Sequence, residues 1–212
     1  MESRNVWISL LLSALPAFST LFLTGAAAAE VVHTASGLGF PANIEGRFTR
    51  GEIEEDGKRC SVTYAGKGGS AVNVGVHPAQ KGATGPTRLD GDEHSAASAA
   101  FTAEVNKRVG LLAEGLKEAT VVSQLRFQAR PSNGPIGIKT TVRGKLEGKT
   151  TNREFLLFER NGFFVCVTTS YASEDWLKVG LIYTDVAHFL GWPQSQQSAQ
   201  PNNSVREKGK SR

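Results

Sequence analysis

Two segments in the second half of the chain alternate apolar and polar residues, and this pattern constrains the fold more than any other. The alternation covers much of Val121 to Arg130 and of Ile136 to Leu146. Successive side chains of a β-strand point to opposite faces, so such alternation is typical of a strand with one buried and one solvated face. We therefore expect an antiparallel sheet.

Glycine-containing turns separate the other predicted strands. These strands are Phe48–Glu55, Cys60–Ala65 and Ala71–His77, followed later by Arg153–Glu159 and Phe163–Ser170. The last two flank Asn161-Gly162, the dipeptide that most strongly favours a tight hairpin, because both residues accept a positive φ. Their nearly continuous apolar content predicts that these two strands lie centrally in the sheet.

Two segments are predicted to be helical. Between Ser95 and Ala119, apolar residues recur at steps of three and four, while Glu104 and Lys107 fall off this stripe. Gly110 within it is expected to mark close packing. The second helix is predicted to begin after Ser173, as a cap, and to end at Gly191. The fold class is α+β, with about six to seven antiparallel strands and two packed helices in the order βββ-α-ββββ-α.

The first 29 residues predict export. A charged start with Arg4 precedes an apolar run from Val6 to Leu23, and a string of small residues ends at Ala29. These are the three parts of a secretory signal peptide, and cleavage is expected near Ala29/Glu30. One globular domain at 30–193 and a disordered polar tail at 194–212 would follow. The predicted location is periplasmic or secreted, and an uncleaved membrane anchor is the alternative.

The charge balance does not favour a nucleic-acid-binding protein. The chain has a formal net charge of +4, and the tail at 194–212 contributes +3 of it. The predicted folded domain is therefore nearly neutral, which is unlike the basic footprint of a nucleic-acid-binding domain.

Cys60 and Cys166, the two cysteines, both fall in predicted strands. An even number of cysteines in an exported protein favours a disulfide, because the compartment is oxidising. The alternative is a pair of separately buried thiols that act as small apolar residues.

Motifs for catalysis and metal binding are weak. The string Asp90–His94 starts like a calcium loop but lacks its completing carboxylate, so it is better explained as acids at a helix N-terminus. The sequence contains neither G-x-S-x-G nor S-x-x-K, and a Cys166–His188 pair would use a thiol in an apolar strand. We therefore predict no catalytic residue, no metal site and no cofactor.

Cations on the two alternating strands form one candidate site. They are Arg126, Arg130, Lys139, Arg143 and Lys145. If the strands pair, all five could lie on one side of the sheet. The simplest interpretation is a solvated face that keeps the protein soluble. The sharper hypothesis is a surface for an anionic envelope component or an acidic protein partner.

Two short motifs suggest a family resemblance. Gly39-Phe40-Pro41-Ala42-x-Ile44, followed by Ser61-Val62-x-Tyr64, resembles small secreted proteins of Gram-negative bacteria that have no assigned function. The element order resembles the Mog1/PsbP-like fold. This resemblance implies a binding or accessory role and no catalytic residues.

The predicted function is an exported, non-enzymatic binding or accessory protein. One alternative is an envelope hydrolase whose site is assembled only by folding. The other is a membrane-tethered interaction protein, which requires that the leader is retained.

Overall fold

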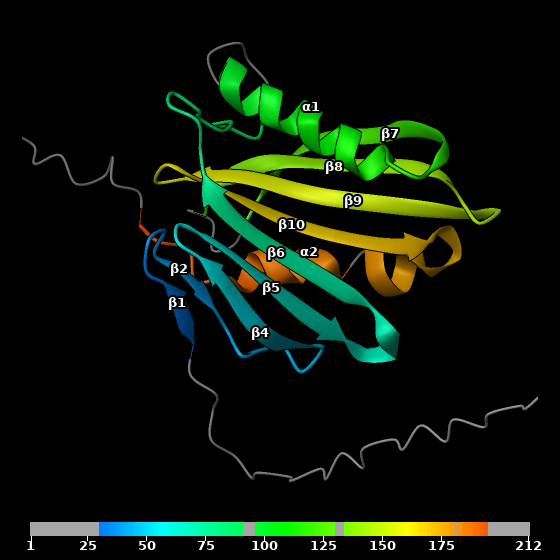
Figure 1. The fold of residues 1–212 in the computed structure, drawn as a ribbon, viewed down its shortest axis with the longest axis horizontal. Coiled ribbons are helices and arrows are strands. Elements are labelled where there is room, and N and C mark those ends of the chain that lie inside the picture. Colours follow the sequence, from blue (N-terminus) through cyan, green and yellow to red (C-terminus); the bar gives the residue numbers. More distant parts are fainter. Residues whose placement is uncertain (1–29, 91–95, 130–133, 181, 195–212) are drawn as a thin grey trace, which may run out of the picture.

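The computed structural model describes residues 30–90, 96–129, 134–180 and 182–194 (Figure 1). The predicted leader, Arg130 and residues 195–212 of the predicted tail lie outside this part of the chain, so the predictions made for them stay predictions. No helix in the described ranges is long and apolar enough to cross a membrane.

Eight strands form one antiparallel sheet in the order β3-β4-β5-β6-β10-β9-β8-β7 (Figure 1). Their bounds are β3 Asn43–Ile44, β4 Phe48–Asp56, β5 Arg59–Gly66, β6 Ala71–Pro78, β7 Lys117–Gln128, β8 Ile136–Leu146, β9 Lys149–Arg160 and β10 Phe163–Ala172. The predicted α+β class and antiparallel sheet are confirmed. β9 and β10 lie in the middle of the sheet, as their apolar sequences predict, and β10 pairs with β6 to join the two halves of the chain.

The turn between β9 and β10 has the predicted hairpin geometry. Asn161 and Gly162 have φ angles of 53° and 81°. Two consecutive positive φ values are typical of a type I′ turn, whose twist matches that of the flanking strands. The register then pairs Phe163 directly with Arg160 and continues without a shift to the end of β10.

The predicted number of strands is too low. β1 (Val31–His33) and β2 (Leu38–Phe40) form a separate two-stranded sheet, and β3 adds two residues to the edge of β4. Segments of two or three residues are too short to display a period of two, so alternation cannot reveal them. Gly39 of β2 exchanges two backbone hydrogen bonds with Gly191, which ties this small sheet to the end of the described chain.

Helix α1 (Ala99–Ala113) is shorter than the predicted segment at 95–119. Ser98 caps its first turn, since Ser98 Oγ accepts a hydrogen bond from the backbone N–H three residues later. Gly115 follows the helix with a φ of 73°, the left-handed conformation that ends many helices. The chain then enters β7 at Lys117, where pairing with β8 satisfies its backbone groups.

The second predicted helix is not one regular helix. The chain forms a 3₁₀ turn η3 (Ser173–Asp175), a π-helical turn η4 (Trp176–Gly180) and a short α2 (Tyr183–Phe189). Ser173 Oγ is buried without a hydrogen-bond partner in the described chain, so the predicted cap is wrong. Gly180 packs against Tyr171 of β10, where a Cβ would lie 2.5 Å from the tyrosine hydroxyl oxygen.

The two faces of the sheet are covered unequally. One face, with Tyr64 and Phe158, packs against β1–β2 and α2. The other face packs against α1 through Phe101 and Phe155. α1 lies on β7, β8 and β9, whereas β4, β5 and β6 extend beyond it (Figure 1). Every second residue of β5, starting from Arg59, is therefore exposed beside the helix.

The predicted Cys60–Cys166 disulfide is not formed, and both thiols are free and buried. Cys60 pairs with Val76 of β6, whereas Cys166 pairs with Gly75, the neighbouring residue on the same strand. The two side chains therefore point to opposite faces, with β6 between them. A disulfide needs Cα atoms closer than about 7 Å, whereas two strand spacings separate these residues by about 10 Å.

Candidate binding cleft

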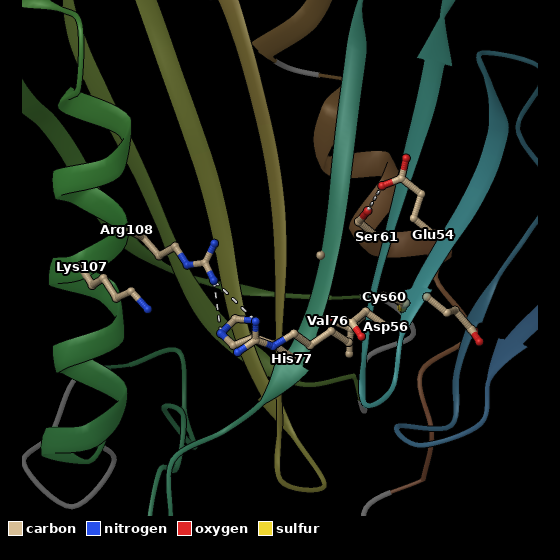
Figure 2. A pocket seen from close by; sticks show the side chains of 11 residues that line it. Glu54, Asp56, Cys60, Ser61, Val76, His77, Lys107 and Arg108 are labelled. Carbon is tan, nitrogen blue, oxygen red and sulfur yellow. Dashed lines mark hydrogen bonds between the residues drawn. The ribbon is translucent and has the colours of Figure 1, made fainter.

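A cleft of about 400 Å³ lies between α1 and the uncovered part of the sheet (Figure 2). It is lined by Glu54, Glu55, Asp56, Arg59, Cys60, Ser61, Gly75, Val76, His77, Lys107 and Arg108. One wall is α1, the other is the end of the β4–β5 hairpin, and the floor is formed by β5 and β6. A volume of this size is within the range of small-molecule sites.

The helix wall is organised around one buried carboxylate. The side chain of Glu104 is only 3% exposed and accepts a hydrogen bond of 2.8 Å from Arg108 Nε. Lys107 Nζ lies 3.7 Å from Glu104 Oε2, and His77 Nε2 lies 3.3 Å from Oε1. Residues three and four positions apart share one face of a helix, which is why both cations reach this carboxylate.

The charges of this cluster give the helix wall a positive balance. Burial raises the pKa of Glu104, but the hydrogen bond and positive charge of Arg108 outweigh it and hold this pKa below its ordinary value. Burial and the nearby Arg108 lower the pKa of His77, so its imidazole is neutral at neutral pH. Two formal cations, Lys107 and Arg108, thus surround one anion.

The opposite wall has a negative balance, because its carboxylates outnumber its one cation, Arg59. Glu54, Glu55 and Asp56 end strand β4, and all three are exposed. Glu54 Oε2 accepts a hydrogen bond of 3.3 Å from Ser61 Oγ. Figure 2 shows Glu54 and Asp56 across the cleft from the α1 cations. The cleft therefore separates charges of opposite sign.

The floor is open because it includes a glycine. Gly75 pairs with Ser61 of β5, and a Cβ built at Gly75 would have no heavy atom within 4 Å. Any larger residue here would project a side chain into the space that a ligand would occupy. Gly75 thus keeps the centre of the cleft accessible.

The described groups of the cleft favour binding over nucleophilic catalysis. Burial raises the pKa of Cys60 to about 11, so its thiol is protonated at neutral pH. Cys166 pairs with Gly75 and points to the α1 side of the sheet, and burial likewise raises its pKa to about 11. Ser61 donates to Glu54, whereas His77 contacts Glu104 and Arg108, so the hydroxyl and the imidazole bond to different partners.

The predicted cation site is divided between the faces of the sheet. Arg126 pairs with Ile138, so it points to the α1 side, and its Nη1 donates to the carbonyl oxygens of Arg88 and Asp90. Lys139 is the next residue after Ile138 and therefore points to the other side. There its Nζ lies 3.2 Å from Glu154 Oε2.

The other predicted cations also have polar partners. Arg143 Nε donates to Asn152 Oδ1 at 2.9 Å, and Lys145 Nζ lies 2.8 Å from Glu118 Oε2. Arg130 lies outside the described residues. The assumption that all five cations share one face is thus wrong, and their binding of an anionic partner stays a prediction.

Within the described ranges, no group of three His, Cys, Asp or Glu residues could hold a metal ion. Asp90 accepts from Arg88 at 3.1 and 3.0 Å, and the rest of the predicted acidic string lies outside these ranges.

A second hollow, of about 670 Å³, lies between the loop at 83–87 and the β9–β10 turn. Arg160 lines it, but its Nε donates to the carbonyl oxygen of Pro193 at 2.9 Å. Burial also lowers the pKa of Arg160. Loops and turns supply most of its lining, and its charged lining residues are Glu159 and Arg160.

Comparison with protein-family models and with curated proteins gives no match. Among solved structures, the chain is similar to cyanobacterial PsbP (CyanoP) from Synechocystis sp. PCC 6803, with a TM-score of 0.48 and 12% identity over 86% of this chain and 99% of that one. It is also similar to PA94 from Pseudomonas aeruginosa, a protein of unknown function described as a putative regulator, with a TM-score of 0.41 and 10% identity over 71% of this chain and 100% of that one.

The first of these structures is a PsbP protein. At these TM-scores and identities, neither similarity supports a statement about function.

Proposed function

We propose that this chain is an exported, non-enzymatic binding protein that holds a small charged ligand between α1 and strands β4–β6. The observation that supports this proposal is the Arg108 guanidinium held on α1 by Glu104, with Lys107 near the same carboxylate. Arg108 is held by Glu104 and contacts His77, so its guanidinium is oriented before a ligand arrives. Such preorganisation reduces the entropy lost on binding.

A non-enzymatic role fits the chemistry of the cleft better than hydrolysis. A hydrolase of the nucleophilic type needs a serine or cysteine beside a general base. Here the thiol of Cys60 is protonated, and Ser61 donates to an exposed carboxylate on the far wall from His77. Export is proposed from the leader, and intact mass of the protein isolated from its native source tests cleavage near Ala29/Glu30.

Filling the floor of the cleft tests the binding proposal. We expect Gly75→Phe to abolish binding, because its ring would occupy the space above β6, where a Cβ at this position meets no other atom within 4 Å. Ala71→Phe is the matched control, since Ala71 lies on the same face of the same strand and outside the cleft.

The measurement is a set of ¹H–¹⁵N NMR spectra recorded with a panel of amino acids, short peptides, carboxylates and amines. The proposal predicts that at least one panel member shifts the amides of Ser61, Gly75 and Arg108. These shifts should disappear in Gly75→Phe and persist in Ala71→Phe. It fails if no panel member shifts cleft amides, or if the two variants respond alike.

A further inference from the structure

The two walls of the cleft differ in charge, and their separation can be estimated from the sheet. His77 lies on β6 beside α1, and Glu54 lies on β4, two strands away. Adjacent strands are about 4.8 Å apart, so β6 and β4 are separated by about 10 Å. A ligand that contacts both walls must therefore carry opposite charges at a comparable distance.

Building on the proposed binding function, we propose that the ligand is a short peptide with free termini, about three residues long. Its C-terminal carboxylate would bind Lys107 and Arg108, and its N-terminal ammonium would lie at the acidic end of β4. An extended chain covers at most about 3.5 Å per residue, so three residues span about 10 Å. A single amino acid carries its two charges on one Cα and cannot reach both walls.

The cationic wall suits a carboxylate. Arg108 has five N–H donors, and its contacts with Glu104 and His77 engage Nε and Nη2. Nη1 is the remaining donor nitrogen. Lys107, the preceding residue of α1, places its ammonium 3.7 Å from the carboxylate of Glu104 that also binds Arg108. Charge-assisted hydrogen bonds from these groups are stronger than neutral ones.

The acidic wall and the floor suit the rest of a peptide. Glu54 and Asp56 are exposed carboxylates on the cleft face of β4 that can accept hydrogen bonds from an ammonium group. Ser61 Oγ lies between the walls, and Gly75 leaves room for the peptide backbone above β6. A ligand with only a negative charge would contact the cations of α1, and a ligand with only a positive charge would contact the acidic end of β4. Neither would use both walls.

Isothermal titration calorimetry with trialanine tests this inference on the mature chain at low salt. We expect trialanine to bind, and N-acetyl-trialanine and trialanine amide each to bind about tenfold more weakly or worse, because each lacks one charge-assisted contact. Alanine itself should bind more weakly than trialanine.

Variants of each wall provide the second arm. Lys107→Gln should weaken trialanine but leave its amide unchanged, since the amide has no carboxylate for this wall. Asp56→Asn should weaken trialanine but leave N-acetyl-trialanine unchanged, since Asp56 pairs with Arg59 and shares the cleft face of the sheet. Lys149→Gln, an exposed charge at the start of β9 outside the cleft, is the matched control and should change nothing.

The outcomes separate this inference from the binding proposal. If blocked peptides bind as tightly as trialanine, or if only another panel member shifts the cleft amides, the peptide inference is wrong and the cleft remains a binding site. If trialanine binds equally to wild type and Gly75→Phe, both proposals fail, because the peptide then binds elsewhere. Absence of binding by every probe also overturns both.

Discussion

At the scale of single residues, Glu104 determines the electrostatics of the cleft. A carboxylate that is 3% exposed is costly to bury unless charges and hydrogen bonds compensate it. Arg108 and Lys107 provide this compensation, and the hydrogen bond from Arg108 also orients its guanidinium along one wall. The same carboxylate therefore stabilises α1 on the sheet and prepares the proposed binding site.

His77 should make stability depend on pH. Its pKa is lowered in the folded protein by burial and Arg108, with Lys107 acting in the same direction and Glu104 opposing them. As the pH falls below the ordinary value of about 6.5, the unfolded chain takes up this proton first, so the free energy of unfolding decreases. Above a pH of about 6.5, His77 is neutral in both the folded and the unfolded chain. The full free energy of unfolding is therefore present there.

Urea denaturation of wild type and His77→Gln at several pH values between 7.5 and 5 measures this effect. We expect a steeper loss of stability in the wild type than in the variant. Glu104, whose pKa is below its ordinary value, stays charged over this range and contributes little to the difference. Parallel curves for the two proteins would show that His77 has no such role.

At the scale of elements, the segment after β10 is shaped by one close contact. Tyr171 donates to Glu154 Oε1 at 2.6 Å, and Gly180 of η4 packs directly on the tyrosine hydroxyl. Sequence periodicity predicts one helix from Ser173 because the apolar stripe is regular there. The actual 3₁₀ and π-helical turns depend on this contact with the sheet, which no local pattern records.

Two glycine substitutions should have opposite effects. Gly180→Ala places a methyl group 2.5 Å from the Tyr171 hydroxyl and should lower the free energy of unfolding by about 1–3 kcal/mol, as overpacking does. Gly110→Ala in α1 meets no heavy atom within 4 Å and should raise it by about 0.5–1 kcal/mol, because alanine favours helix.

Chemical denaturation of both variants gives these values directly. An equal effect of the two substitutions would contradict the packing described for Gly180. The open space at Gly110 also shows that the predicted close packing of this glycine is wrong.

At the scale of the whole molecule, β6 joins the two halves of the sheet and keeps the cysteines apart. Export to an oxidising compartment favours pairing of two cysteines, but Cys60 and Cys166 lie on opposite faces. Two thiols in an oxidising compartment can form a disulfide, but these two point away from each other across β6 and cannot meet. The fold should therefore be stable without a disulfide.

Mass spectrometry of the protein isolated from its native source tests this conclusion. After denaturation without a reductant, we expect two alkylated thiols per chain and no mass change on reduction. Native protein should react slowly, since both cysteines are buried and burial raises both pKa values to about 11. An unalkylated chain whose mass increases by two hydrogen atoms on reduction would restore the disulfide hypothesis.

The sequence by itself determined the local structure. Alternation located β7 and β8, the Asn161-Gly162 pair located the central hairpin, and the three- and four-residue period located α1. These features depend on residues that are close in the sequence, so short sequence segments are enough to predict them. The spacing of Glu104, Lys107 and Arg108 was also visible, but nothing local indicated that Glu104 is buried.

Only the tertiary structure decided which residues meet. Arg126 and Lys139 lie on opposite faces because of the register between β7 and β8, which shifts twice before Ser123. A change of one residue in register moves every side chain to the other face, so the sequence could not group these cations. The cleft itself exists because α1 covers only part of the sheet and leaves Gly75 and Ser61 open beside its cations. Its two charged walls come from segments about 50 residues apart, joined by the pairing of β10 with β6 and by the packing of α1.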